Sequence, residues 1–283
     1  MHDITLRIKY KKRQKISRQV KEKILELHRK VPAKWNELTS EQLLEIIRIQ
    51  FSSESGNYQK LLLLKELLQV DMPTMLLMSE VQHIQLYQLL NFLEDNNLTT
   101  QLLPSVEPEE GLLLHGPSER FRNLTFAEFI YTETLYARLA KKVEDTTLDR
   151  FIAVLYRPER EDYNPKSPNY KGDIRQDFNE HLIEQRMPLI SKLPMQHKLA
   201  ILAWYRGCKR ELEQLYDKVF TESNVKKASK SDWGDVVLSL SGGRFGTLEQ
   251  TATQRVHTIF KEMQRLAREH EEIERLNKRN SPQ

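Results

Sequence analysis

Hydrophobic and polar positions alternate at the start of the chain. Over residues 3–10, one face of an extended segment would carry Ile4, Leu6, Ile8 and Tyr10. A period of two predicts a β-strand. Three partners for this strand remain open, namely residues 98–103, residues 112–115 or another chain. From residue 17 the spacing changes, and a short helix over residues 17–30 is expected to bury Val20, Ile24, Leu25 and Leu27.

Farther along the chain, apolar residues recur at the three- and four-residue spacing of amphipathic helices. Thr39, Thr125 and Thr247 are each followed three residues later by Gln or Glu, the sequence of a capping box at a helix N-terminus. The pattern therefore predicts a mainly all-α fold with a short N-terminal strand or basic arm. We expect helices over residues 40–51, 58–69, 79–94, 124–139, 147–156, 177–187, 195–220, 232–240 and 247–277.

Composition along the chain indicates two helical subdomains. Proline, glycine and asparagine concentrate in residues 96–123, which is typical of an irregular connector. Residues 157–172 hold three prolines and two tyrosines and predict an exposed loop. The expected order is a basic arm (1–30), a helical subdomain (31–95), the connector (96–123), a second helical subdomain (124–220), a linker (221–231) and a C-terminal helical hairpin (232–283).

The net charge of +4 conceals an uneven distribution. The first 30 residues contain 11 Lys or Arg and three acids, so that this arm carries +8 and the rest of the chain −4. A basic arm can be a solvated segment, can bind nucleic acid through residues 7–30, or can dock on an acidic protein. Tyr10 is the one aromatic residue in the arm, which leaves the case for base stacking weak.

Several protein classes are excluded by composition. The longest stretch without a charged residue is 81–93, too short to span a bilayer, and residues 1–15 lack the apolar core of a secretory signal. One cysteine, Cys208, rules out an internal disulfide and a thiolate zinc cluster. We therefore expect a soluble protein of a reducing compartment, without membrane association.

Catalytic motifs are scarce. HExxH, GxSxG and the Walker GxxxxGK[ST] sequence are absent. Glu80 and His83 form an isolated Glu-x-x-His, and His181 with Glu184 has the spacing of a local pair on one helix face. Residues 241–246 predict a turn between two helices, with an anion-binding turn as the alternative. The sequence therefore predicts no enzymatic activity and no cofactor or metal, although a site assembled from distant residues would leave no motif.

Five stretches together resemble a known group of proteins. They are VPAKWNELT, LHGPSERFRNLTFAEF, LDRFIAVLYRP, LAILAWYRGCKRELEQLY and DWGDVVLSLSGGRFGTLEQT. The set is similar to uncharacterised proteins that phages and prophages of Bacteroides-type bacteria encode near tail-morphogenesis genes. Its closing part resembles tail assembly chaperones. That resemblance implies binding of a tape-measure or tail-tube protein, and it transfers no functional residue.

The sequence thus predicts a protein-binding role in phage tail assembly, in the cytoplasm of the bacterial host. Two alternatives are a virion component, such as a connector or tail-completion protein, and a nucleic-acid-binding protein. The surfaces expected to contact a partner are the basic arm, the 157–172 loop, the turn over residues 241–246 and the charged C-terminal helix. The candidate contact residues are Arg7, Lys9, Lys11, Lys12, Arg13, Lys15, Arg157, Arg160, Tyr163, Tyr170, Arg244 and Phe245.

Overall fold

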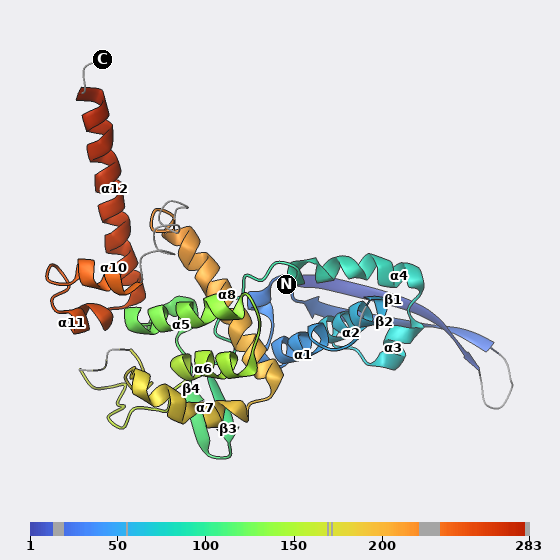
Figure 1. Ribbon diagram of the computed structural model, residues 1–283. Coiled ribbons are helices and arrows are strands. Elements are labelled where there is room, and N and C mark those ends of the chain that lie inside the picture. The colour runs from blue at the N-terminus through green and yellow to red at the C-terminus, as the bar shows by residue number, and fades with distance from the viewer. Residues whose placement is uncertain (14–19, 55, 169, 171, 221–232, 281–283) are drawn as a thin grey trace. The chain divides into compact units, whose positions relative to one another are not determined.

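A computed structural model describes residues 1–13, 20–54, 56–168, 170, 172–220 and 233–280 (Figure 1). The chain divides into two compact units. Unit 1 comprises Met1–Leu98 together with Leu202–Arg206, and unit 2 comprises Thr99–Ile201 and Gly207–Gln283. The division between Leu98 and Thr99 falls inside the connector predicted over residues 96–123.

The expectation of an all-α fold is wrong. The structure is 57% helical and 14% strand, with the strands in two small antiparallel sheets, so the fold is mixed and mostly helical. The first sheet pairs β1 (His2–Arg13) with β2 (Val20–Val31), and the second pairs β3 (Ser105–Glu109) with β4 (Leu112–His115).

The β1–β2 ribbon confirms the strand predicted over residues 3–10 and corrects its surroundings. The partner of β1 is β2, in a register that pairs Leu6 with Leu27 and Ile8 with Leu25. The predicted helix over residues 17–30 is therefore wrong. Leu25 and Leu27 turn to the covered face while Ile24 is 63% exposed, which is the alternation of a strand. Cross-strand pairing outweighs the local helical spacing here because one ribbon face is buried.

Unit 1 packs short helices against this ribbon. Thr39 and Gln42 form the expected capping box at the start of the first α-helix. Leu43, Ile46 and Leu64 lie in the core between the first two α-helices. The helical elements of unit 1 are η1 (Trp35–Glu37), α1 (Ser40–Gln50), α2 (Gly56–Leu68), α3 (Met72–Leu77), α4 (Glu80–Leu86) and the 3₁₀ helix η2 (Tyr87–Leu93). The helix expected over residues 79–94 is thus divided between α4 and η2, and α3 was not anticipated.

Unit 2 is built on a layer in which α6 lies between α5 and α7, with β3 against α7 (Figure 1). A second capping box, Thr247 with Gln250, begins α11 as expected. The elements are η3 (Glu119–Phe121), α5 (Phe126–Leu139), α6 (Asp145–Leu155), η4 (Glu180–Leu182), α7 (Ile183–Ser191), α8 (Met195–Leu215), α10 (Trp233–Leu240), α11 (Leu248–Ala252) and α12 (Val256–Asn280). The middle of α8, Leu202–Arg206, belongs to unit 1.

An aromatic cluster fixes the start of α12 in unit 2. The ring of Phe260 lies 5.1 Å from that of Phe129 and 5.9 Å from that of Phe126, both edge to face. Phe220 and Tyr216 complete the cluster around the same ring. The single C-terminal helix expected over residues 247–277 is broken in two because the backbone between α11 and α12 pairs with the segment before α5.

Candidate partner-binding surfaces

The β1–β2 ribbon is anchored by its proximal half. Leu6 and Ile8 of β1 are 7% and 0% exposed, and the ribbon contacts α2 and α3. The side-chain amide of Gln82 on α4 donates a hydrogen bond to the backbone carbonyl of Arg7 (3.0 Å). The buried apolar side chains and this hydrogen bond hold the proximal half of the ribbon against the helices of unit 1.

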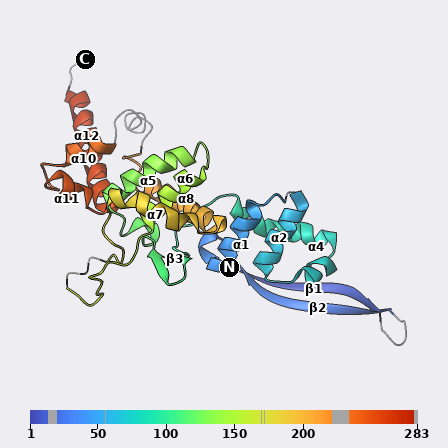
Figure 2. The same ribbon diagram turned by 60° about the horizontal axis from the view of Figure 1, so that its bottom comes forward.

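Most of the basic charge lies in the distal half of the ribbon. The described distal residues, 9–13 and 20–23, contain six of the 11 Lys and Arg of the first 30 residues, and their one acid is Glu22. The side chains of Lys9, Lys11 and Lys23 are exposed. In both views the distal ends of β1 and β2 extend beyond α3 and α4 (Figures 1 and 2). The buried residues that anchor the ribbon are therefore separate from the basic residues at its distal end, and only the pairing of the strands shows this separation.

The remaining candidates of the arm divide between the two halves. Arg7 lies in the anchored half, where its Nη2 is 3.4 Å from Glu26 Oε1. Lys12 and Arg13 occupy the last positions of β1. Lys15 lies outside the described residues. The structure thus brings Lys9, Lys11, Lys12 and Arg13 together in one strand and separates Arg7 from them by its ion pair.

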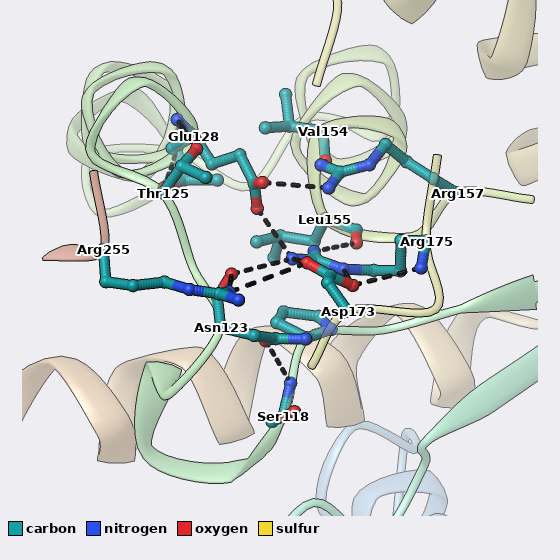
Figure 3. A network of polar contacts seen from close by, with 12 residues as sticks. Ser118, Asn123, Thr125, Glu128, Val154, Leu155, Arg157, Asp173, Arg175 and Arg255 are labelled. Atoms are coloured by element: carbon teal, nitrogen blue, oxygen red, sulfur yellow. Dashed lines mark hydrogen bonds and ion pairs between the residues drawn. The ribbon is translucent and has the colours of Figure 1, made fainter. Parts of the chain in front are cut away.

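Arg157 contradicts its predicted role as an exposed contact, because it is 1% exposed. It belongs to a buried polar network with Arg175 at the C-terminal end of α6 (Figure 3). Arg186 is buried at the same end of the helix. The three guanidinium groups donate to three consecutive carbonyl oxygens of the last turn of α6: Arg157 Nη1 to Val154 (2.9 Å), Arg175 Nη1 to Leu155 (2.9 Å) and Arg186 Nη1 to Ala153 (3.1 Å). Positive charge at the negative end of a helix is favourable, so these arginines cap α6.

Two carboxylates compensate the buried arginines. Glu128, on α5 and 1% exposed, bridges Arg157 and Arg175 at 2.9 Å and 3.1 Å (Figure 3). Asp173 lies 2.8 Å from Arg175 Nη2. Burial alone would raise the pKa of Asp173, but the hydrogen bonds and charge of Arg175 offset it and hold this pKa below its usual range. Glu128 was expected to complete a capping box with Thr125; only the Thr125 half of that box is formed.

Arg186 is the least compensated member of the network. It is 5% exposed, and its Nη2 has no hydrogen-bond partner among the described residues. Burial, and then the like charge of Arg157, lower the pKa of Arg186 to about 10. The network therefore acts as a structural cap for α6 and as the anchor of the chain that follows it.

The loop predicted over residues 157–172 is held by local contacts. Arg160 Nε lies 2.6 Å from Asp162 Oδ1. The rings of Tyr163 and Tyr170 meet edge to face at 5.6 Å. Arg160 and both tyrosines are partly exposed, so the described part of the loop offers a small polar and aromatic surface.

Arg244 and Phe245 line a groove in the described part of unit 2. It has a volume of about 1050 Å³ and runs between the end of α8, the turn before α11 and one face of α12. Arg244 is ion-paired with Glu262 at 3.1 Å, and Arg265 on α12 contacts the same carboxylate at 2.7 Å. Most of the charges that line this groove are thus paired with one another.

Another side of α12 carries an apolar stripe. Its positions follow the three- and four-residue spacing of a coiled-coil seam: Val256, Ile259, Met263, Leu266, His270, Ile273 and Asn277. Val256 and Ile259 are fully buried, whereas Leu266, Ile273 and the adjacent Leu276 are 42%, 56% and 51% exposed. In Figure 1 the C-terminal half of α12 extends past α10 and α11. The stripe thus begins in the core of unit 2 and continues, uncovered by the described residues, along the projecting half.

The isolated motifs of the sequence are not assembled into a site. Cys208 is buried, with its Sγ 3.6 Å from the carbonyl of Thr99, and burial raises the pKa of its thiol. A protonated thiol of this kind is a poor nucleophile. No group of three or more His, Cys, Asp or Glu residues suited to a metal ion occurs in the part of the chain that the structure describes. The described helices also include none that is both long and apolar enough to cross a membrane.

Comparison of the chain with protein-family models, with curated proteins and with solved structures finds no match.

Proposed function

We propose that this chain is a non-enzymatic binding protein of phage or prophage tail assembly that engages an amphipathic helix of its partner through α12. The observation that carries the proposal is the exposed part of the α12 stripe. Leu266, Ile273 and Leu276 are large apolar side chains on a helix that leaves the body of unit 2. A surface of this form suits a second helix, which would complete the seam.

The charges beside the stripe restrict the partner. Four of the six residues over 269–274 are glutamates, at positions 269, 271, 272 and 274. In a parallel pair of two copies of this chain, Glu269 would lie beside Glu274 of the other copy, and like charges at these flanking positions disfavour pairing. A partner helix with Lys or Arg beside its apolar stripe is complementary.

The resemblance to tail assembly chaperones supports the same role. Those proteins bind the tape-measure protein and help tail-tube subunits to assemble. The turn and the helices that carry the resemblance, residues 232–251, directly precede α12 along the chain. We infer that a helical segment of the tape-measure or tail-tube protein is the partner.

The experiment is an affinity pull-down from phage-producing cells with the full chain and two variants. The test variant, L266Q/I273Q, makes the seam polar at two exposed positions. The control variant, R275Q/K278Q, changes two exposed residues on the solvent side of the same helix. Each lysate is divided, one half is treated with nuclease, and the proteins recovered are identified by mass spectrometry.

The proposal expects a long helical tape-measure-like protein or tail-tube subunits with the wild type and the control, in both halves, and their loss with L266Q/I273Q. Equal recovery by all three proteins, or recovery that nuclease abolishes, would contradict it. Purified particles are analysed in parallel, because a chaperone leaves the particle and a virion component remains in it.

A further inference from the structure

We propose that the distal end of the β1–β2 ribbon, residues 9–13 and 20–23, is a binding site for double-stranded DNA. This site lies in unit 1 and is independent of the partner proposed for α12. Three observations support it: the ribbon is regular, its far end extends past the helices of its own unit, and its charge is concentrated there.

The reach of the ribbon fits a DNA groove. β1 and β2 pair without interruption from His2–Val31 to Arg13–Val20. The strand continues five residues beyond the fully buried Ile8, which at roughly 3.4 Å per residue amounts to about 17 Å. The major groove of B-DNA is about 12 Å wide and about 8.5 Å deep, and it admits a two-stranded ribbon. The described strands are therefore long enough to enter it while the proximal half stays packed on unit 1.

Positive charge is present on both faces of the distal ribbon. Lys9 and Lys11 share the outward face, and Lys23 lies across from Tyr10 on the other face. All three lysines are exposed, and no carboxylate lies within ion-pair distance of them in the described part of the chain. A ribbon inside a groove has phosphates on either side of it, whereas an acidic protein surface would meet one face only. The charge on two faces therefore favours duplex DNA over an acidic protein.

The distribution of charge also distinguishes this site from a merely solvated segment. In the proximal half, residues 1–8 and 24–31 carry three basic and two acidic residues, and Arg7 is paired with Glu26. If the charge served only to keep the ribbon soluble, the distal half would be expected to mix basic and acidic residues, as the proximal half does. The basic residues instead gather where the ribbon leaves the protein.

The test is fluorescence anisotropy with the full chain and a labelled 20-base-pair DNA duplex over a series of salt concentrations. With four to six phosphates neutralised, the logarithm of the binding constant should fall with the logarithm of salt concentration at a slope of about −4 to −5. The ribbon variant K9Q/K11Q/K23Q should bind at least about tenfold more weakly and should reduce the slope by about 3, because each replaced lysine removes about one ion pair with a phosphate. The control variant K34Q/K141Q/K166Q removes the same charge from exposed positions elsewhere and should bind within about twofold of the wild type.

The competitors complete the test. Poly-glutamate and an A-form RNA duplex of the same length are added to the complex, since the deep and narrow major groove of A-form RNA does not admit a ribbon. The proposal expects both to compete less well than unlabelled DNA. Equal binding by the ribbon and control variants would overturn it, and so would better competition by poly-glutamate or by the RNA duplex.

Discussion

Two groups of basic side chains in this protein have opposite environments. In unit 2, Arg157, Arg175 and Arg186 are buried and bind carbonyl and carboxylate oxygens at the end of α6. In unit 1, Lys9, Lys11 and Lys23 are exposed at the far end of a ribbon. Positive charge thus has two uses in this chain. The arginines form hydrogen bonds and ion pairs within the chain, whereas the exposed lysines can bind a partner.

The difference follows from what surrounds each group. A buried guanidinium is tolerated only where oxygens satisfy its donors and a carboxylate balances its charge. Exposed lysines need neither, because water solvates them. The buried group should therefore govern stability and the exposed group binding, which can be tested by changing one at a time.

The largest effect is expected for Glu128→Gln. The neutral amide leaves Arg157 and Arg175 without their shared counter-charge, and breaking a buried ion pair in this way costs about 3–5 kcal/mol. Urea unfolding followed by circular dichroism measures the loss. The control is Glu144→Gln, which removes an exposed carboxylate 3.0 Å from Lys142 and should cost less than about 1 kcal/mol. If both variants lost a similar free energy of unfolding, the burial of the Glu128 carboxylate would not explain its contribution to stability.

Asp173→Asn should have an intermediate and pH-dependent effect. The substitution removes charged hydrogen bonds to Arg175, for a loss of about 1–3 kcal/mol at pH 7. Because the folded pKa of Asp173 is lowered, its contribution is fully present above the unfolded pKa of about 4 and is lost as pH falls through the folded value. The free energy of unfolding is measured for both proteins between pH 3 and 7. The gap between them should narrow as the pH falls below about 4, and a constant gap would contradict this account.

Arg186→Met should change the free energy of unfolding by less than about 1 kcal/mol. The variant loses one bond to Ala153 but also removes a buried charge whose Nη2 has no partner among the described residues. Arg175→Met is the matched contrast, because it deprives Glu128 and Asp173 of a shared counter-charge and should cost at least about 3 kcal/mol. Thermal and urea unfolding of the two variants side by side would refute the ranking if Arg186 proved the more costly.

The smallest effect on stability is expected for K9Q/K11Q/K23Q. These exposed side chains make no buried contact, so the triple variant should unfold within about 0.5 kcal/mol of the wild type while its binding to DNA weakens. Urea unfolding on the same preparation used for anisotropy measures both properties. A loss above about 1 kcal/mol in the free energy of unfolding would show that these lysines stabilise the fold, as the buried arginines do, and would contradict the comparison.

Local sequence signals predicted several elements correctly. The capping boxes of Thr39 and Thr247 are formed as expected, because each depends on residues three apart. The box of Thr125 is only half formed. The carboxylate of Glu128 turns instead to Arg157 and Arg175, which lie 29 and 47 positions farther along the chain. Nothing within three residues of Glu128 could have indicated that choice.

The candidate contact residues show the same division. Arg157 and Lys9 were both predicted from the sequence as exposed basic contacts, yet Arg157 is 1% exposed and Lys9 is exposed on the ribbon. The exposure of the C-terminal half of α12 was expected from its charged sequence. The apolar stripe was expected only as far as Leu266, because the many charges beyond Arg268 hide its continuation to Ile273.

The sequence by itself determined the alternation of β1, the starts of α1 and α11, the scarcity of catalytic motifs and the charge of the first 30 residues. Each of these depends on neighbours along the chain. Only the tertiary structure decided that residues 20–31 form a strand, that Arg157 is buried and that the lysines gather at the distal end of a ribbon. The physical reason is that strand pairing and charge burial are settled by groups brought together from distant positions, whose energies outweigh local preference.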